Sequence, residues 1–136
     1  MKTLTMTLLL FSHFTFAQAG CEKNFDDFLS SISENRNIQE KFISYPLKYI
    51  YIDLQSPEMP LVEKKLSEKD IKTTEFSIYP LKSRQKHHGL VHKIIDKNAT
   101  SAKVDVFKPE TDYLLTFTFQ IKSDCWFLVE YIDSSL

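Results

Sequence analysis

Three histidines lie close together in the sequence and are the residues best suited to bind a metal ion. His88 and His92 are four positions apart, so on a helix they would face the same way and could bind zinc through their ring nitrogens. Gly89 lies between them, however, and the acidic residues of a zinc protease motif are missing. On a strand the pair would share a face but lie too far apart for easy chelation. We therefore interpret residues 82–93, which also contain His87, as a solvated basic stretch and predict no metal site.

Other catalytic patterns are missing from the sequence. Serines and threonines are plentiful, but none lies in a Gly-x-Ser-x-Gly elbow, and the only glycines are Gly20 and Gly89. Phosphate-binding loops also need glycines, which excludes a P-loop and a dinucleotide fingerprint. Asp26 and Asp27 would point to different sides of a helix, so we interpret them as solvated charges near its N-terminus. The sequence therefore predicts no catalytic residue and no cofactor.

Cys21 and Cys125 are the only cysteines. In an oxidising compartment such a pair tends to form a disulfide. This bridge would enclose about 100 residues and, by chain-entropy arguments, stabilise the fold by roughly 4 to 5 kcal/mol. Two alternatives stay open: Cys21 could carry lipid as the first residue of a bacterial lipoprotein, which would leave Cys125 single, or Cys125 could be a buried, unreactive thiol.

The first 19 residues have the plan of a secretory signal peptide. A basic start at Lys2 precedes an apolar run over 4–16, and Ala17 and Ala19 supply the small residues that cleavage after Ala19 requires. The run is shorter than the roughly 20 apolar residues that cross a membrane. We therefore predict that residues 1–19 are a cleaved signal peptide.

The segment that follows this leader, residues 20–136, has the size of a single domain. Gln18 disfavours lipidation of Cys21, because a lipoprotein signal usually has a leucine-like residue there. Without Lys2, the chain has 16 basic and 18 acidic residues, a balance that argues against nucleic acid as a partner. We predict a secreted or periplasmic protein, with a lipoprotein as the alternative.

Helical periodicity follows the first cysteine. Over 23–35 apolar residues recur at spacings of three, four and seven, with polar residues between them and Asn24 as the N-cap. A second, shorter helix is predicted over 38–44, ended by Pro46. The apolar residues of the first helix are Phe25, Phe28, Leu29 and Ile32.

The middle of the chain mixes strand and helix signals. Residues 47–52 alternate as a strand does, and 73–79 are rich in strand-forming residues, so both are predicted as strands. Between them, the charged segment 63–72 is predicted as a weak surface helix or turn, since Ser67 and Asp70 have capping-box spacing.

The second half of the chain is dominated by strands. Two long strands, 113–122 and 125–132, are joined by a tight turn at Ser123-Asp124. In the first, Tyr113, Leu115, Phe117, Phe119 and Ile121 share one face. In the second, strict alternation puts Cys125, Phe127, Val129 and Tyr131 opposite Trp126, Leu128, Glu130 and Ile132. Shorter strands are predicted over 90–95 and 103–108.

This order of elements predicts an α+β domain, with N-terminal helices packed on a curved antiparallel sheet. The stretches Asn24–Phe28, Phe42–Leu47 and Trp126–Ser135 resemble small secreted bacterial proteins of unknown function in the nuclear-transport-factor-two-like superfamily. That resemblance implies a cone formed by sheet and helices, with a concavity in which members bind small molecules or, in a minority, carry out acid–base chemistry. No catalytic position of those enzymes matches a residue of this chain.

Two functional classes follow from these observations. The first is an exported, non-enzymatic binding protein of the bacterial envelope that engages a small apolar ligand or a protein partner, for example as an immunity protein against a delivered toxin. The alternative is a cone-fold isomerase or hydrolase that uses His92, Tyr113 or Asp105 as its base.

Overall fold

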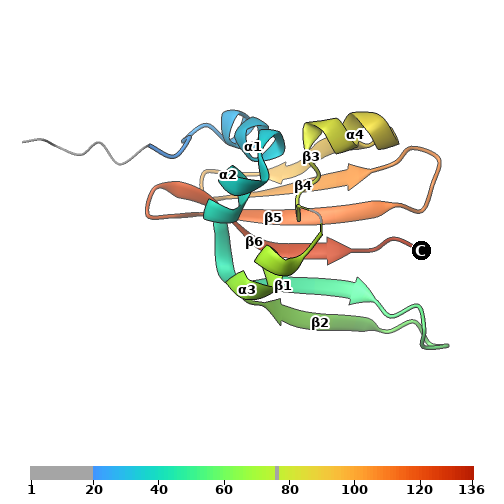
Figure 1. Ribbon diagram of the computed structural model, residues 1–136. Coiled ribbons are helices and arrows are strands. Elements are labelled where there is room, and N and C mark those ends of the chain that lie inside the picture. Colours follow the sequence, from blue (N-terminus) through green and yellow to red (C-terminus); the bar gives the residue numbers. More distant parts are fainter. Residues whose placement is uncertain (1–19, 76) are drawn as a thin grey trace, which may run out of the picture.

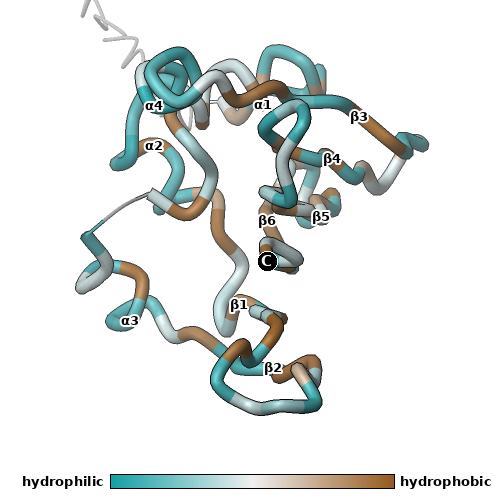
Figure 2. Tube along the Cα trace, turned by 90° about the vertical axis from the view of Figure 1, so that its right-hand side faces the viewer, coloured by the Kyte–Doolittle hydropathy of each residue, from teal (hydrophilic) through white to brown (hydrophobic). Residues whose placement is uncertain are grey.

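The computed structural model describes residues 20–75 and 77–136. Helices cover one face of a six-stranded sheet with the strand order β2-β1-β6-β5-β4-β3 (Figure 1). Figure 2 shows this sheet nearly end-on, curving from β3 through β6 to β2 with the helices on its concave side. The predicted α+β class is therefore confirmed, whereas the predicted signal peptide at 1–19 lies outside the described residues.

The first helix, α1 (Phe25–Glu34), forms where the periodicity predicted it. Its four predicted apolar residues are all buried, and the Asn24 side chain caps it by accepting a hydrogen bond from the backbone N–H of Asp27 at 3.1 Å. The second helix, α2 (Arg36–Lys41), begins and ends earlier than the predicted 38–44.

Strand β1 (Ile43–Ile52) starts four residues before its predicted beginning, so Pro46 lies inside the strand and does not end the preceding helix. The Tyr45–Pro46 peptide bond is cis. Pairing with β2 starts only at Leu47, and pairing with β6 is irregular between Ile43 and Lys48. Proline is accommodated here because the sheet does not require its missing N–H.

The prediction of a surface helix or turn over 63–72 is wrong for its first part and correct for its second. Its first part belongs to β2 (Leu61–Leu66), which pairs along β1 as an exposed edge, and its second part is α3 (Glu68–Thr73). The predicted capping box is confirmed, because Ser67 and Asp70 exchange hydrogen bonds between side chain and backbone.

The predicted strand over 73–79 is wrong, because Thr73 ends α3 and the described residues 74–75 and 77–79 join no sheet on the way to α4 (Lys82–His88). The chain reverses at Gly89, whose left-handed backbone (φ 65°) ends α4.

Four strands complete the sheet: β3 (Val91–Lys97), β4 (Ser101–Phe107), β5 (Leu114–Lys122) and β6 (Cys125–Asp133). Adjacent strands in this part pair antiparallel, as predicted, with the turn at Ser123-Asp124. The sheet as a whole is mixed, because β1 pairs parallel to β6. Within the described residues, no helix is long and apolar enough to span a membrane.

The core lies between the helices and the concave face of the sheet. Phe25 of α1 makes ring contacts with Phe119 of β5 and Trp126 of β6, at centroid distances of 5.4 and 4.9 Å. Trp126 also donates a hydrogen bond from Nε1 to the carbonyl of Lys23 at 3.0 Å. These contacts attach the start of the described chain to its last hairpin.

Candidate functional site

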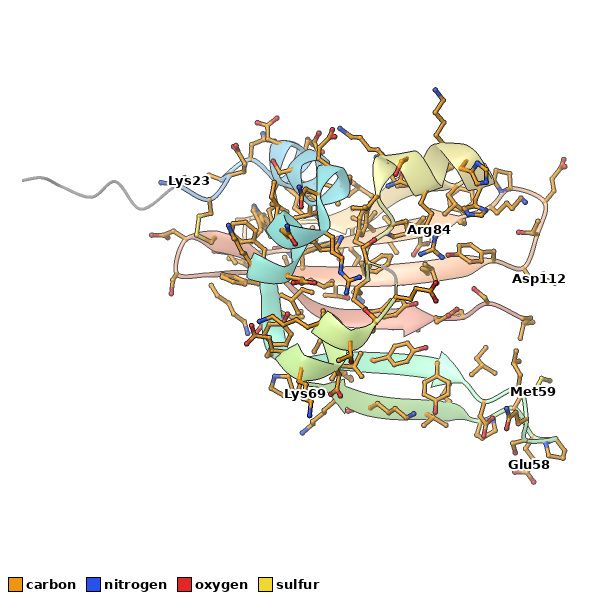
Figure 3. The ribbon with its side chains drawn as sticks, in the orientation of Figure 1. Lys23, Glu58, Met59, Lys69, Arg84 and Asp112 are labelled. Carbon is orange, nitrogen blue, oxygen red and sulfur yellow. A yellow bond between two sulfur atoms is a disulfide. The ribbon has the colours of Figure 1, made fainter. Side chains whose placement is uncertain are left out.

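A cavity of 290 Å³ lies between the irregular segment after α3 and the sheet, and we call it the main cavity. Strands β5 and β6 supply one wall and α4 contributes Arg84, which Figure 3 shows directed from the helix toward the sheet. The lining residues are Thr74, Glu75, Ser77, Ile78, Arg84, Tyr113, Leu115, Tyr131 and Asp133.

Helix side chains hold the irregular wall of the main cavity in place. The buried Gln39 amide accepts a hydrogen bond from the backbone N–H of Tyr79 and donates one to its carbonyl, both at 2.9 Å. Gln85 of α4 donates to the carbonyl of Pro80 at 2.7 Å. Arg36 donates to the carbonyls of Ile71 and Glu75, at 3.0 and 3.2 Å. The segment therefore has partners for its backbone without joining a sheet.

A β-bulge in β6 determines which side chains form the opposite wall. Phe119 pairs with Leu128 and Thr118 pairs with Glu130, so Val129 is an extra residue in the strand. Beyond the bulge, Tyr131 and Asp133 lie on the same face as the buried Leu128. The alternation predicted from the sequence, which put Tyr131 opposite Leu128, is therefore wrong.

Flat aromatic rings line the concave face beside this wall. The ring of Tyr131 stacks on Phe117 at 5.1 Å and on Tyr49 at 4.9 Å, with interplanar angles of 7° and 13°. Tyr49 in turn stacks on Tyr51 at 5.1 Å. The row thus extends from β5 across β6 to β1 (Figure 1). Because Tyr131 lies between two stacked rings, its faces are covered and its edge and hydroxyl are the parts that remain for a ligand.

The phenols of the main cavity stay protonated at neutral pH. Burial raises the pKa of Tyr131 far above its ordinary value, and the negative charge of Asp133 adds to the increase. Burial also raises the pKa of Tyr113, while the positive charge of Arg84 acts in the opposite direction. Both hydroxyls therefore serve as hydrogen-bond donors or acceptors and not as bases.

The structure separates the residues that the sequence named as acid–base candidates. Tyr113 lines the main cavity, as an enzyme would require. Asp105 alternates with the buried Val104 and Val106, so it lies on the opposite face of the sheet, where it accepts a 2.6 Å hydrogen bond from Thr116. His92 is exposed on β3 and lines a different surface hollow, beside α1.

The histidines do not gather into a metal site. His87 and His88 end α4 with their rings 4.9 Å apart, whereas His92 follows the turn at Gly89 and belongs to β3. No group of three or more metal-ligating residues occurs in the described part of the chain. The basic stretch over 82–93 is exposed at most positions, but it folds as a helix, a turn and the start of a strand.

Cys21 and Cys125 form a disulfide, with their Cα atoms 5.6 Å apart. The sequence left three interpretations of these cysteines open, and the structure contains the disulfide. A disulfide-bonded Cys21 has no thiol left to carry lipid. A disulfide is consistent with an oxidising compartment.

Sequence reasoning missed Arg84, Tyr131 and Asp133 as lining residues. The bulge that turns Tyr131 and Asp133 inward has no signal in the strand's own sequence, because β-branched residues such as Val129 are equally suited to regular strands. Arg84 was included only as one basic residue among several in 82–93.

Comparison with known proteins identifies the fold. No protein-family model matches the sequence, and no curated protein matches it. Among solved structures, the chain is similar to an NTF2-like (nuclear-transport-factor-two-like) protein from Bacteroides fragilis NCTC 9343, with a TM-score of 0.60 and 17% identity over 85% of this chain. The match covers 48% of that protein, so this chain spans about half its length.

A weaker likeness is to an NTF2-like protein of unknown function from Shewanella baltica OS155. Its TM-score is 0.45 at 14% identity, and the match covers 76% of this chain and 82% of that one. The first likeness is sufficient for the fold: the chain has the NTF2-like fold that its sequence resemblance implied.

Proposed function

We propose that this protein with an NTF2-like fold is a non-enzymatic binding protein of an oxidising, extracytoplasmic compartment, and that a small polar organic molecule occupies its main cavity. The observation that supports this proposal most is the lining of the cavity. Arg84, Asp133 and two protonated phenols supply hydrogen-bonding groups, and stacking on Phe117 and Tyr49 holds the Tyr131 ring in place.

The lining also changes the ligand expected from the sequence. A wholly apolar ligand would remove solvent from the hydroxyls of Tyr113 and Tyr131, at a cost of about 1–3 kcal/mol for each hydroxyl left unpaired. It would also cover the charge of Asp133, whose Oδ1 accepts a hydrogen bond from the N–H of Ser135 at 3.0 Å. A ligand with its own donors and acceptors avoids this cost. The volume of 290 Å³ lies at the lower end of small-molecule sites, which favours a compact molecule.

The enzyme alternative is weaker on the same geometry. Among the three bases named from the sequence, only Tyr113 lines the main cavity, and its raised pKa keeps it protonated at neutral pH. A general base needs a pKa close to the working pH. An enzymatic role would therefore have to use a lining carboxylate, Glu75 or Asp133, in place of the three candidates.

A protein partner is the second candidate, favoured by the exposed end of the β1–β2 hairpin. Leu54, Met59 and Leu61 are 56%, 52% and 69% exposed there, and Figure 3 shows Met59 and its neighbour Glu58 at the far tip. Exposed apolar patches are typical of sites that contact another protein. An immunity role belongs to this candidate.

A ligand screen with matched variants tests the proposal. Purified, disulfide-bonded protein is screened by thermal shift against small polar aromatic compounds, and the affinity of each hit is measured by calorimetry. We expect Tyr131→Phe and Asp133→Asn to weaken binding about tenfold, because each removes one half-buried hydrogen-bonding group or charge from the lining. Asp105→Asn, which makes the same change on the opposite face of the sheet, is expected to bind as the wild type does.

Two results would count against a ligand in the main cavity. One is a screen without hits, combined with a specific protein partner whose binding is lost in Leu54→Ser and Leu61→Ser. The other is a set of hits whose affinities are the same in all three variants.

A further inference from the structure

A second cavity of 210 Å³ adjoins the main cavity beside the C-terminal end of α4. It is lined by Arg84, His88, Leu90, Lys108 and Tyr113. Arg84 and Tyr113 line both cavities, so the two share a wall. A ligand that reaches past these two side chains would contact both.

The charges of the two cavities differ. Three of the five residues lining the second cavity carry basic side chains, and none of the described residues that line it carries a carboxylate. The main cavity, by contrast, contains Glu75 and Asp133. The whole chain has a net charge of −1, so this separation is not the result of a general excess of basic residues.

Backbone hydrogen bonds fix the positions from which these side chains extend. The N–H of Leu90 donates to the carbonyl of Gln85 at 2.8 Å across the turn at Gly89, next to His88. The N–H of Lys108 donates to the carbonyl of Tyr113 at 3.3 Å, which closes the loop between β4 and β5. Gln85 in turn ties α4 to the carbonyl of Pro80.

We propose that the second cavity is the anion subsite of the ligand site: Arg84, His88 and Lys108 bind a carboxylate or phosphate group of a molecule whose remaining polar part lies in the main cavity. This inference rests on the proposed function and narrows its ligand to an organic anion. A guanidinium group matches a carboxylate or phosphate with two parallel hydrogen bonds, and a lysine adds a mobile point charge. The protonated hydroxyl of Tyr113 supplies a further donor at the shared wall.

The test uses simple anions as probes of the subsite alone. Isotope-labelled, disulfide-bonded protein is titrated by NMR with inorganic phosphate and, separately, with acetate, at constant ionic strength set with sodium chloride. We expect saturable shifts of the amide signals of Gly89, Leu90 and Lys108, with millimolar affinity. Comparing phosphate with acetate tells which of the two groups the subsite prefers.

Single substitutions distinguish specific binding of the anion in this cavity from general electrostatic attraction to nearby basic side chains. Lys108→Gln is expected to weaken phosphate or acetate binding about fivefold, since it removes one charged donor from the lining. His88→Leu is expected to weaken binding less, since it removes a ring N–H donor. Lys86→Gln is the matched control, because Lys86 is an exposed residue of α4 that does not line the cavity. This substitution should change the affinity less than about twofold.

Two outcomes would overturn the anion subsite. One is the absence of saturable shifts with either probe, and the other is an equal loss of affinity in Lys86→Gln and Lys108→Gln. Neither outcome would contradict the proposal of a ligand in the main cavity. A neutral aromatic compound whose binding depends on Tyr131 would still support the proposed function. Conversely, saturable phosphate binding without any hit for the main cavity would support the subsite while the proposed function fails.

Discussion

Removing the disulfide between Cys21 and Cys125 is expected to cost the fold a large part of its stability. The two residues are 104 positions apart, so the bridge closes nearly the whole described chain into one loop. In the chain-entropy model, closure of a loop of this length stabilises the folded state by about 4.7 kcal/mol. A domain of this size has a total of about 5–15 kcal/mol, so the loss is a third or more.

The folded structure should survive this change. The start of the chain is also attached by the hydrogen bond from Trp126 to Lys23 and by the contact of Phe25 with the Trp126 ring. The bridge acts mainly on the unfolded ensemble, which expands when it is absent. We therefore expect the variant Cys21→Ser/Cys125→Ser to have the circular dichroism spectrum of the wild type and a steeper denaturant dependence.

Urea unfolding of the double variant and the wild type provides the measurement. Wild-type protein treated with a reducing agent is the control, and its stability should agree with that of the double variant within about 1 kcal/mol. A difference between the double variant and the oxidised wild type below about 1 kcal/mol would refute the reasoning, since most of the predicted loop-closure term would then be missing.

Two further predictions concern the wall of the main cavity. Gln39→Leu is expected to lower the free energy of unfolding in urea by about 3 kcal/mol, because the backbone N–H and carbonyl of Tyr79 lose their partner while staying buried; a loss below about 1 kcal/mol would contradict this role. Tyr79→Phe is expected to leave the same free energy unchanged or raise it by about 1 kcal/mol, because the Tyr79 hydroxyl is buried without a hydrogen-bond partner among the described residues; a clear decrease would mean that it has one.

The sequence predicted the elements whose pattern is local. Helix α1 follows from the spacing of its apolar residues and its Asn24 cap, and both strands of the β5–β6 hairpin follow from their alternation and the turn between them. In α1 and β5 the residues that face the core are also those that define the periodicity, whereas in β6 pattern and packing agree only up to the bulge at Val129.

The parts that sequence reasoning missed depend on contacts between distant segments. Residues 73–79 have the composition of a strand, but the side chain of Gln39, some forty positions away, takes the place of a neighbouring strand at Tyr79. The lysine-rich β2 is a strand only because the free edge of β1 is available to it. Propensity is overridden by tertiary contacts in both cases.

The candidate site was less predictable than the fold for the same reason. Its lining combines residues of α4, the irregular segment and two strands, and only Tyr113 among them was named from the sequence as a candidate functional residue. Tyr131 and Asp133 reach the cavity through the pairing of β6 with β5. That pairing is a property of two strands together and is not visible in either strand alone.

The extra residue in β6 has a consequence for how the chain tolerates changes in length. Val129 separates the residues that pack under α1, Trp126 and Leu128, from those that line the cavity, Tyr131 and Asp133. Without Val129, β6 would alternate regularly, and all four of these side chains would still face the interior. Homologues are therefore expected to gain or lose a residue here while preserving the same interior, and alignments that forbid a gap at this point would mispair everything after it.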